Sequence, residues 1–106
     1  MLIMLTADIE KPEGMASNDF FEVWRQESVA AMEAYKAGKI KHIYKVAGKY
    51  QITAVMEVDD GDEMDDIIHN LPIWSLGYAH IAKNITWTAL RPYENWAKQL
   101  EVLAKG

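Results

Sequence analysis

The residue best suited to chemistry in this sequence is Glu27, a carboxylate in the middle of an otherwise apolar helical face. On a wheel of about 100° per residue, that face comprises Phe20, Trp24, Ala31, Ala34 and Tyr35. An unpaired buried carboxylate is costly, so Glu27 is expected to be ion-paired, protonated or beside a polar cavity. A partly apolar pocket raises the pKa of such a group toward neutrality, which suits a general base that moves a proton.

Two more polar side chains come from the strand expected after this helix. Between Lys39 and Ala47 the sequence alternates, with Ile40, His42, Tyr44 and Val46 on one face. If this face points inward, an imidazole and a phenol enter the same space as Glu27. An inward histidine is more often a hydrogen-bonded core residue than a functional one, so both interpretations stay open here.

Other kinds of site have little support in the sequence. His42, His69 and His80 lack the spacing of metal ligands, and there is no cysteine. A Gly-rich phosphate loop and a nucleophile elbow are also missing. An inward acid without these motifs suits simple proton transfer better than redox chemistry or hydrolysis, and we expect neither a metal nor a cofactor.

Charge and composition narrow the range of partners. The net charge of -5 argues against nucleic acid or an anionic membrane, because both reward clustered lysine and arginine. The apolar start of the chain is far shorter than the roughly 20 residues of a membrane span. Without cysteine, a reducing compartment is permitted. We therefore expect a soluble cytoplasmic protein that binds a small molecule.

The elements that must position Glu27 follow from breaker residues and hydrophobic periodicity. A capping box of Asp19 and Glu22 is expected to start the first helix, and Gly38 to end it. Gly48-Lys49 is expected to turn one strand into the next. The expected elements are a strand over Leu2 to Ile9, a helix over Asp19 to Ala37, strands over Lys39 to Ala47 and Tyr50 to Val58, a helix over Asp62 to Asn70 ending before Pro72, and a strand over Tyr78 to Leu90.

This β-α-β-β-α-β order predicts an α+β fold of ferredoxin-like type, with a four-stranded antiparallel sheet and both helices on one face. Residues 1–90 form this core, and residues 91–106 form a C-terminal extension of the same single domain, 1–106. The extension is expected to be an amphipathic helix over Tyr93 to Lys105. Its apolar stripe comprises Tyr93, Trp96, Leu100 and Leu103.

The predicted sheet has one face without helices, which needs a partner of its own. We therefore expect a homo-oligomer, at least a dimer that packs sheet on sheet. The C-terminal helix could pack on its own domain or reach across to a neighbouring subunit.

The chain resembles the muconolactone Δ-isomerase family, small enzymes of aromatic-compound catabolism. The resemblance covers about the first three quarters of the chain, and its most specific stretch is GKIKHIYKVAGKY, residues 38–50. Other matching positions include Lys11-Pro12, Met15, Glu27, Val55, Val58 and Leu71-Pro72. The resemblance implies a ferredoxin-like subunit that dimerises into an α+β barrel, assembles further into decamers and uses no cofactor.

The reaction that the resemblance implies is a 1,3 proton shift that converts muconolactone into 3-oxoadipate enol-lactone. By position, Glu27 matches the proposed general base, and His42 and Tyr50 match residues near the substrate. Either of the latter could stabilise the dienolate by hydrogen bonding. The residues expected to bind the substrate are Trp24, Lys41, Tyr44, Lys45 and Trp74, with the two lysines standing where the family has arginines.

Two other functions fit the same residues. Similar dimeric barrels include cofactor-independent oxygenases, which would share the base and the aromatic lining. The protein could also be a non-catalytic small-molecule-binding protein in which Glu27 is ion-paired with His42 or a lysine. The C-terminal helix is unlike the short polar tail of the family, which leaves the substrate open.

Overall fold

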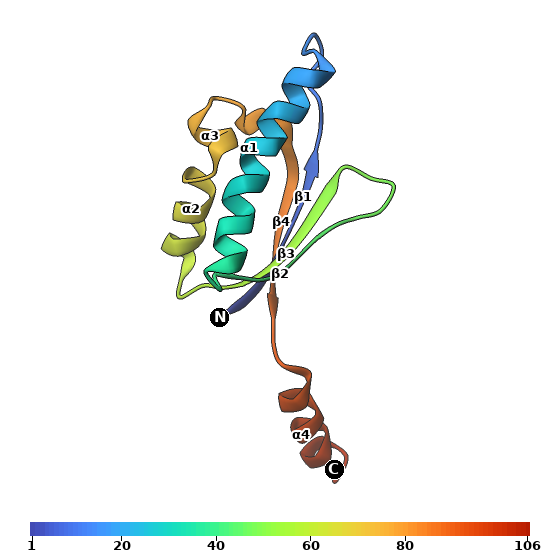
Figure 1. Ribbon diagram of the computed structural model, residues 1–106. Helices are drawn as coiled ribbons and strands as arrows, with labels where there is room; N and C mark the ends of the chain where they lie inside the picture. The colour runs from blue at the N-terminus through green and yellow to red at the C-terminus, as the bar shows by residue number, and fades with distance from the viewer.

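The fold is built on a four-stranded sheet that is covered by helices on one side. The computed structural model describes residues 1–106. In chain order the elements are β1 (Leu2–Ile9), α1 (Ser17–Lys36), β2 (Ile40–Lys45), β3 (Gln51–Glu57), α2 (Gly61–His69), α3 (Pro72–Ser75), the 3₁₀ helix η1 (Ala79–Ile81), β4 (Ala82–Leu90) and α4 (Tyr93–Leu103). Figure 1 shows α1, α2 and α3 on one side of the strands and α4 far beyond the end of β4.

The strand order is β2-β3-β1-β4, and every neighbouring pair is antiparallel. Strands β1 and β3 occupy the centre, as expected when two β-α-β units interleave. This is the ferredoxin-like arrangement, so the predicted fold class is confirmed. The predicted hairpin between β2 and β3 is also present, with Gly48 at a φ of +81°.

The core consists of two clusters on the helix-covered face. One lies between the sheet and α2 and contains Ile3, Ala54, Met56 and Val58. The other lies where α1 and α3 meet one end of the sheet and contains Phe20, Val23, Ile73 and Ile81. The second cluster fixes the N-terminal half of α1 over the sheet, and Glu27 follows Val23 by about one turn.

The predicted start of α1 is wrong by two residues. The helix begins at Ser17 with Ala16 as its N-cap, and no side chain caps it. Asp19 lies in the first turn, where a negative charge favours the helix dipole without capping it. Glu22 does not close a capping box because its carboxylate pairs with Arg25 instead, with an N–O distance of 2.7 Å.

The end of α1 agrees with prediction. Gly38 adopts a φ of +80°, where only glycine is free of strain. The Gly38 N–H donates to the Tyr35 carbonyl at 3.1 Å, and the Lys39 N–H donates to the Ala34 carbonyl at 3.0 Å. This pair of bonds is a Schellman motif, which stops the helix and turns the chain into β2.

A β-bulge at Lys41 changes the register of β2. Ile40 pairs with Met56, but His42 pairs with Val55, so two steps along β2 match only one step along β3. The extra residue leaves the strand's side chains out of strict alternation after Ile40.

This bulge decides which side chains of β2 face the helices. Residues paired across an antiparallel ladder share a face. Ile43 pairs with the buried Ala54 and therefore points toward the helices, while Tyr44 pairs with Thr53 on the other face. The sequence analysis left open whether the face with His42 and Tyr44 points inward, and within the single chain the bulge separates these two side chains from Ile40 and turns them to the open sheet face.

The segment after α2 also differs from prediction. Helix α2 ends at His69, before Pro72, as expected, but Pro72 then begins the short helix α3. The last strand starts at Ala82 instead of Tyr78, because η1 occupies the intervening residues. Proline at the first helical position favours a helix start, since its fixed φ is helical and its missing N–H is not needed there.

The C-terminal helix α4 follows the sheet after only Arg91 and Pro92, and it ends at Leu103, two residues before the predicted end. It gives the chain an elongated shape of 60 × 27 × 22 Å. None of the helices is long and apolar enough to cross a bilayer.

Candidate active site

Glu27 lies on the covered face of α1, as the helical wheel predicts, and is half-buried. Its Oε1 accepts a hydrogen bond of 2.9 Å from the backbone N–H of Ile73. None of the chain's salt bridges involves Glu27. Burial raises the pKa of Glu27 above its ordinary value, and the Ile73 N–H partly opposes that rise. The carboxylate is thus desolvated and held in place without a neutralising cation.

The donor to Glu27 comes from the first turn of α3. The N–H groups at a helix start have no partner within the helix, so they are free to bind an anion. Ile73 is itself buried among Phe20, Val23 and Ile81, which fixes the position of its N–H. Sequence reasoning missed this contact because it interpreted Pro72 only as a stop, although proline also signals a helix start.

An aromatic corner, made of Trp24, Tyr50, Phe20 and Phe21, lies beside Glu27. The rings of Trp24 and Tyr50 meet edge to face, with centroids 5.3 Å apart. The centroid of the Tyr50 ring also lies 6.1 Å from that of Phe20 and 6.0 Å from that of Phe21. Trp24 precedes Glu27 by three residues, so their Cβ atoms lie about 5–6 Å apart. The corner therefore places apolar surface about one helical turn from Glu27.

Lys45 brings a positive charge to the same side of the sheet. It pairs with Ile52, which alternates with the buried Ala54, so Lys45 faces the helices. Its Nζ lies 5.7 Å from the centroid of the Tyr50 ring and donates to the Val46 carbonyl at 3.1 Å. The sequence places Lys45 and His42 on opposite faces of the strand, as the structure does, and Lys45 is the one on the helix-covered face.

The other predicted site residues lie elsewhere in the single chain. His42 and Tyr44 stack on each other on the open sheet face, with centroids 6.4 Å apart and planes 5° apart. Lys41 is exposed at the bulge. Trp74 packs edge-on against His69, with centroids 4.8 Å apart. Glu27, Trp24, Lys45 and Tyr50 are therefore the predicted residues that share one side of the sheet.

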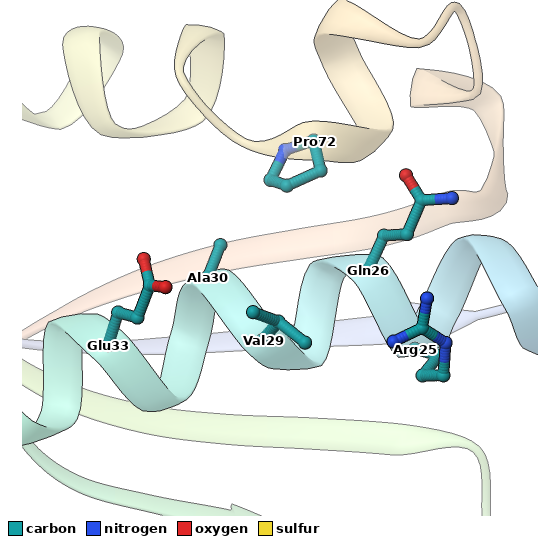
Figure 2. A pocket seen from close by; sticks show the side chains of 6 residues that line it. All are labelled: Arg25, Gln26, Val29, Ala30, Glu33 and Pro72. Atoms are coloured by element: carbon teal, nitrogen blue, oxygen red, sulfur yellow. The ribbon is translucent and has the colours of Figure 1, made fainter.

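Two open hollows lie along α1, each with a volume of 370–390 Å³. The first is lined by Arg25, Gln26, Val29, Ala30, Glu33 and Pro72, and Figure 2 shows Pro72 facing α1 across it. The second is lined by Met15, Asp19, Glu22, Val23, Gln26, Leu76 and Tyr78. Neither includes Glu27, because both open on the flank of α1 that points away from the aromatic corner.

The four residues that share a side offer a consistent set of chemical groups. A half-buried carboxylate with a raised pKa accepts a proton more readily than an exposed glutamate does. A phenol can donate a hydrogen bond to a developing oxyanion, and an ammonium can receive an acidic substituent. The site gathers no group of three acidic or histidine side chains that could hold a metal ion.

Comparisons with known proteins agree with this architecture. The curated muconolactone Δ-isomerase of Acinetobacter baylyi is 24% identical over 74 residues, covering 70% of this chain and 77% of the relative. Muconolactone Δ-isomerase 1 of Acinetobacter lwoffii is 27% identical over 75 residues, covering 71% and 78%. A crystal structure of muconolactone isomerase has the same fold, with a TM-score of 0.69 at 20% identity over 87% of this chain and 90% of that one. The family model for muconolactone delta-isomerase matches residues 1–95, and the chain therefore belongs to this family of isomerases.

Proposed function

We propose that this chain is a cofactor-free isomerase that moves the ring double bond of an unsaturated lactone. The proposed substrate is muconolactone, and the product is 3-oxoadipate enol-lactone. Family membership supports this reaction. The observation that carries the proposal is the desolvated carboxylate of Glu27, held by one backbone N–H and by no cation.

Glu27 acts as the base in this mechanism. It takes the proton from the γ-carbon of the ring, and the electron pair moves through the double bond to the carbonyl, giving a dienolate. The protonated Glu27 then returns the proton to the α-carbon, so the double bond shifts by one position. No atom is gained or lost, and a single carboxyl group can serve both steps because its pKa lies nearer neutrality than that of an exposed glutamate.

Tyr50 and Lys45 have complementary tasks in the proposal. The dienolate places negative charge on the lactone oxygen, and the exposed phenol of Tyr50 is suited to donate a hydrogen bond to it. The substrate's carboxylate arm needs a cation, which Lys45 supplies beside the Tyr50 ring. His42 lies on the open sheet face, so we assign the donor role to Tyr50 instead.

The functional unit in this proposal is a homodimer that packs sheet on sheet, and it can assemble further. The sheet face opposite α1 carries half-buried Leu2, Met4 and Val55, which pair with one another or with neighbours across the strands. A face of this kind is normally covered in an antiparallel sheet protein. Such packing would also cover the His42–Tyr44 stack.

The experiment that tests the function is direct assay of a panel of unsaturated lactones. Muconolactone is expected to be converted to the enol-lactone without oxygen uptake, followed by proton NMR of the ring and by an oxygen electrode. In deuterated water the α-carbon of the product should gain deuterium when the carboxyl proton exchanges before it is returned. Oxygen consumption with a polyphenol and no double-bond migration in any lactone would favour the oxygenase instead.

The raised pKa of Glu27 predicts two pH effects of opposite sign. Activity needs the ionised carboxylate, so kcat/KM should rise with pH through an apparent pKa above the ordinary value of 4.5. Stability should respond in the other direction, because the folded state favours the protonated form. Compared with Glu27→Gln, the wild type should be most stable below about pH 4.5 and should lose stability as the pH rises through the folded pKa.

Thermal unfolding of the two proteins between about pH 4 and pH 8, alongside a kcat/KM profile, measures both effects. A difference in Tm that does not change with pH would show that the folded protein does not shift the pKa of Glu27.

A further inference from the structure

Three polar side chains join three strands on the open sheet face. Asp8 of β1 follows the buried Ala7, so it points away from the helices. Its Oδ1 accepts a hydrogen bond of 2.9 Å from Nε2 of Gln51, its direct partner in β3. Its Oδ2 accepts a second bond of 2.9 Å, from Nδ2 of Asn84 in β4. This Asp8 cluster, made of Asp8, Gln51 and Asn84, ties the central strand β1 to both of its neighbours.

The bonds of the Asp8 cluster are made to a charged group. The Asn84 amide, and next the Gln51 amide, lower the pKa of the Asp8 carboxyl because they hydrogen-bond its ionised form. Partial desolvation opposes this effect, and the charge of Lys49 supports it. Hydrogen bonds to an ionised acceptor are stronger than those between neutral groups. The carboxylate is therefore ionised at neutral pH and holds two amides at once.

Asn84 occupies a backbone position that the Asp8 cluster helps to stabilise. Between Thr6 and Asp8 the register of β1 against β4 shifts, and two steps along β1 match three along β4. Asn84 lies in this bulge with a φ of +53°, and it is the only residue other than glycine with a positive φ. Asparagine tolerates this region better than most residues, and its side chain gains the bond to Asp8. The bulge in β4 therefore depends on the same carboxylate that holds β3.

The Asp8 cluster lies directly behind Tyr50. Tyr50 and Gln51 are consecutive, so their side chains point to opposite faces, and the Tyr50 ring meets Trp24 in the aromatic corner. Strand β1 holds this pair by two bonds, because the Ile9 N–H donates to the Tyr50 carbonyl at 2.8 Å and Asp8 accepts from Gln51. The Tyr50 side chain is 49% exposed, so its direction depends on how firmly its backbone is held.

We propose that Asp8 is a positioning residue for Tyr50, on which it acts through the Asp8 cluster from the opposite face of the sheet. The inference rests on the proposed function, in which Tyr50 donates a hydrogen bond to the dienolate. Such a donor must be held close to its productive geometry, and a displacement of about 1 Å can cost about a hundredfold in rate. Asp8 points away from the site of Glu27, so it influences the reaction through Tyr50.

A double-mutant cycle tests this role. Tyr50→Phe removes the donor and is expected to lower kcat for muconolactone about a hundredfold. Asp8→Ala breaks the cluster and should lower kcat about tenfold, with a smaller change in KM. In the Tyr50→Phe background, Asp8→Ala should change kcat by less than about twofold, because no donor is left to misplace. Equal losses in the two backgrounds would overturn the proposal, and so would a kcat for Asp8→Ala within about twofold of wild type.

An exchange of donor and acceptor separates positioning from a loss of stability. Asp8→Asn alone places an amide NH₂ against one of the two donors, so one bond of the cluster is lost. Adding Gln51→Glu reverses donor and acceptor, which restores both bonds and the net charge. This double variant should recover kcat to within about twofold of wild type, and it decides the matter if Asp8→Ala does not fold. A recovered Tm without a recovered kcat would contradict the positioning role.

Glu10→Ala is the matched control. Glu10 directly follows β1, and its Oε1 lies 3.5 Å from Nζ of Lys83 in β4, but its side chain makes no hydrogen bond to β3. The variant thus removes a neighbouring carboxylate and leaves the Asp8 cluster intact. Its kcat should stay within about twofold of wild type.

Fluorine NMR of protein that carries 3-fluorotyrosine observes Tyr50 without any turnover. The Tyr50 line, identified by its absence in Tyr50→Phe, should shift or broaden in Asp8→Ala and stay unchanged in Glu10→Ala. An unchanged line in Asp8→Ala would overturn the positioning role, whether or not lactone is converted. A line that responds to Asp8→Ala in a protein that converts no lactone would contradict the isomerase reaction alone, and the placement of Tyr50 by Asp8 would stand.

Discussion

Replacing Glu27 with glutamine is expected to lower kcat by about a hundredfold or more while the fold survives. General acid–base catalysis by one positioned group contributes roughly 10²–10⁴-fold, and the amide cannot take the proton. The glutamine has the same shape, and its oxygen can still accept the Ile73 N–H that Glu27 accepts at 2.9 Å. Steady-state kinetics with muconolactone, together with the Tm of each protein, measures the two effects separately.

Glu33→Gln is the matched control, because Glu33 is exposed on the same helix and lines the hollow beside Pro72. This variant should retain nearly full activity. Full activity in Glu27→Gln would remove Glu27 from the mechanism. A large fall in Tm, with activity lost only in proportion to the unfolded fraction, would favour a structural role and a non-catalytic protein.

Replacing Phe20 with alanine is expected to destabilise the protein by about 3–5 kcal/mol, a large share of the stability of a chain this size. Phe20 is 1% exposed and contacts the rings of Trp24 and Tyr50 while packing on Ile73. Its removal leaves a cavity at the junction of α1, α3 and the sheet. The same change therefore loosens both the aromatic corner and the donor to Glu27.

Phe21→Ala provides the comparison. The Phe21 ring is 47% exposed, so its removal should lower the free energy of unfolding by less than about 1.5 kcal/mol. Urea unfolding of both variants at one fixed protein concentration gives the two values. A similar loss for the two substitutions would show that Phe20 is not part of the core in solution, where the assembly could redistribute burial.

Much of the fold was predictable because local chemistry and overall topology agree. The alternating strands, the helical periodicity of α1 and the glycine at position 38 each specify one structure. The bulge at Lys41 was missed although the sequence carries a sign of it, because Ile43 breaks the alternation by placing an apolar side chain on the face that otherwise holds lysines. Helix α3 was missed because its four residues make little more than one helical turn, which is too short to show a hydrophobic periodicity.

The candidate site also combines features that the sequence predicts with features that it does not. Glu27 could be identified from its angle on a wheel, which depends only on residue spacing. Its partner is a backbone N–H, which every residue except proline carries, so no side chain in the sequence announces it. The orientation of His42 could not be fixed from the sequence, since one extra residue in a strand carries the following side chains to the opposite face of a sheet. Lys45 reached the site by the same shift.

The bond from Ile73 to Glu27 links the pKa of the proposed base to the position of helix α3. That N–H stabilises the charged form, so any displacement of α3 that lengthens the bond raises the pKa of Glu27 further. Changes in residues 71–77 that alter this bond should therefore shift the pH range of the proposed reaction. The position of the short helix α3 thus helps to set the pKa of Glu27.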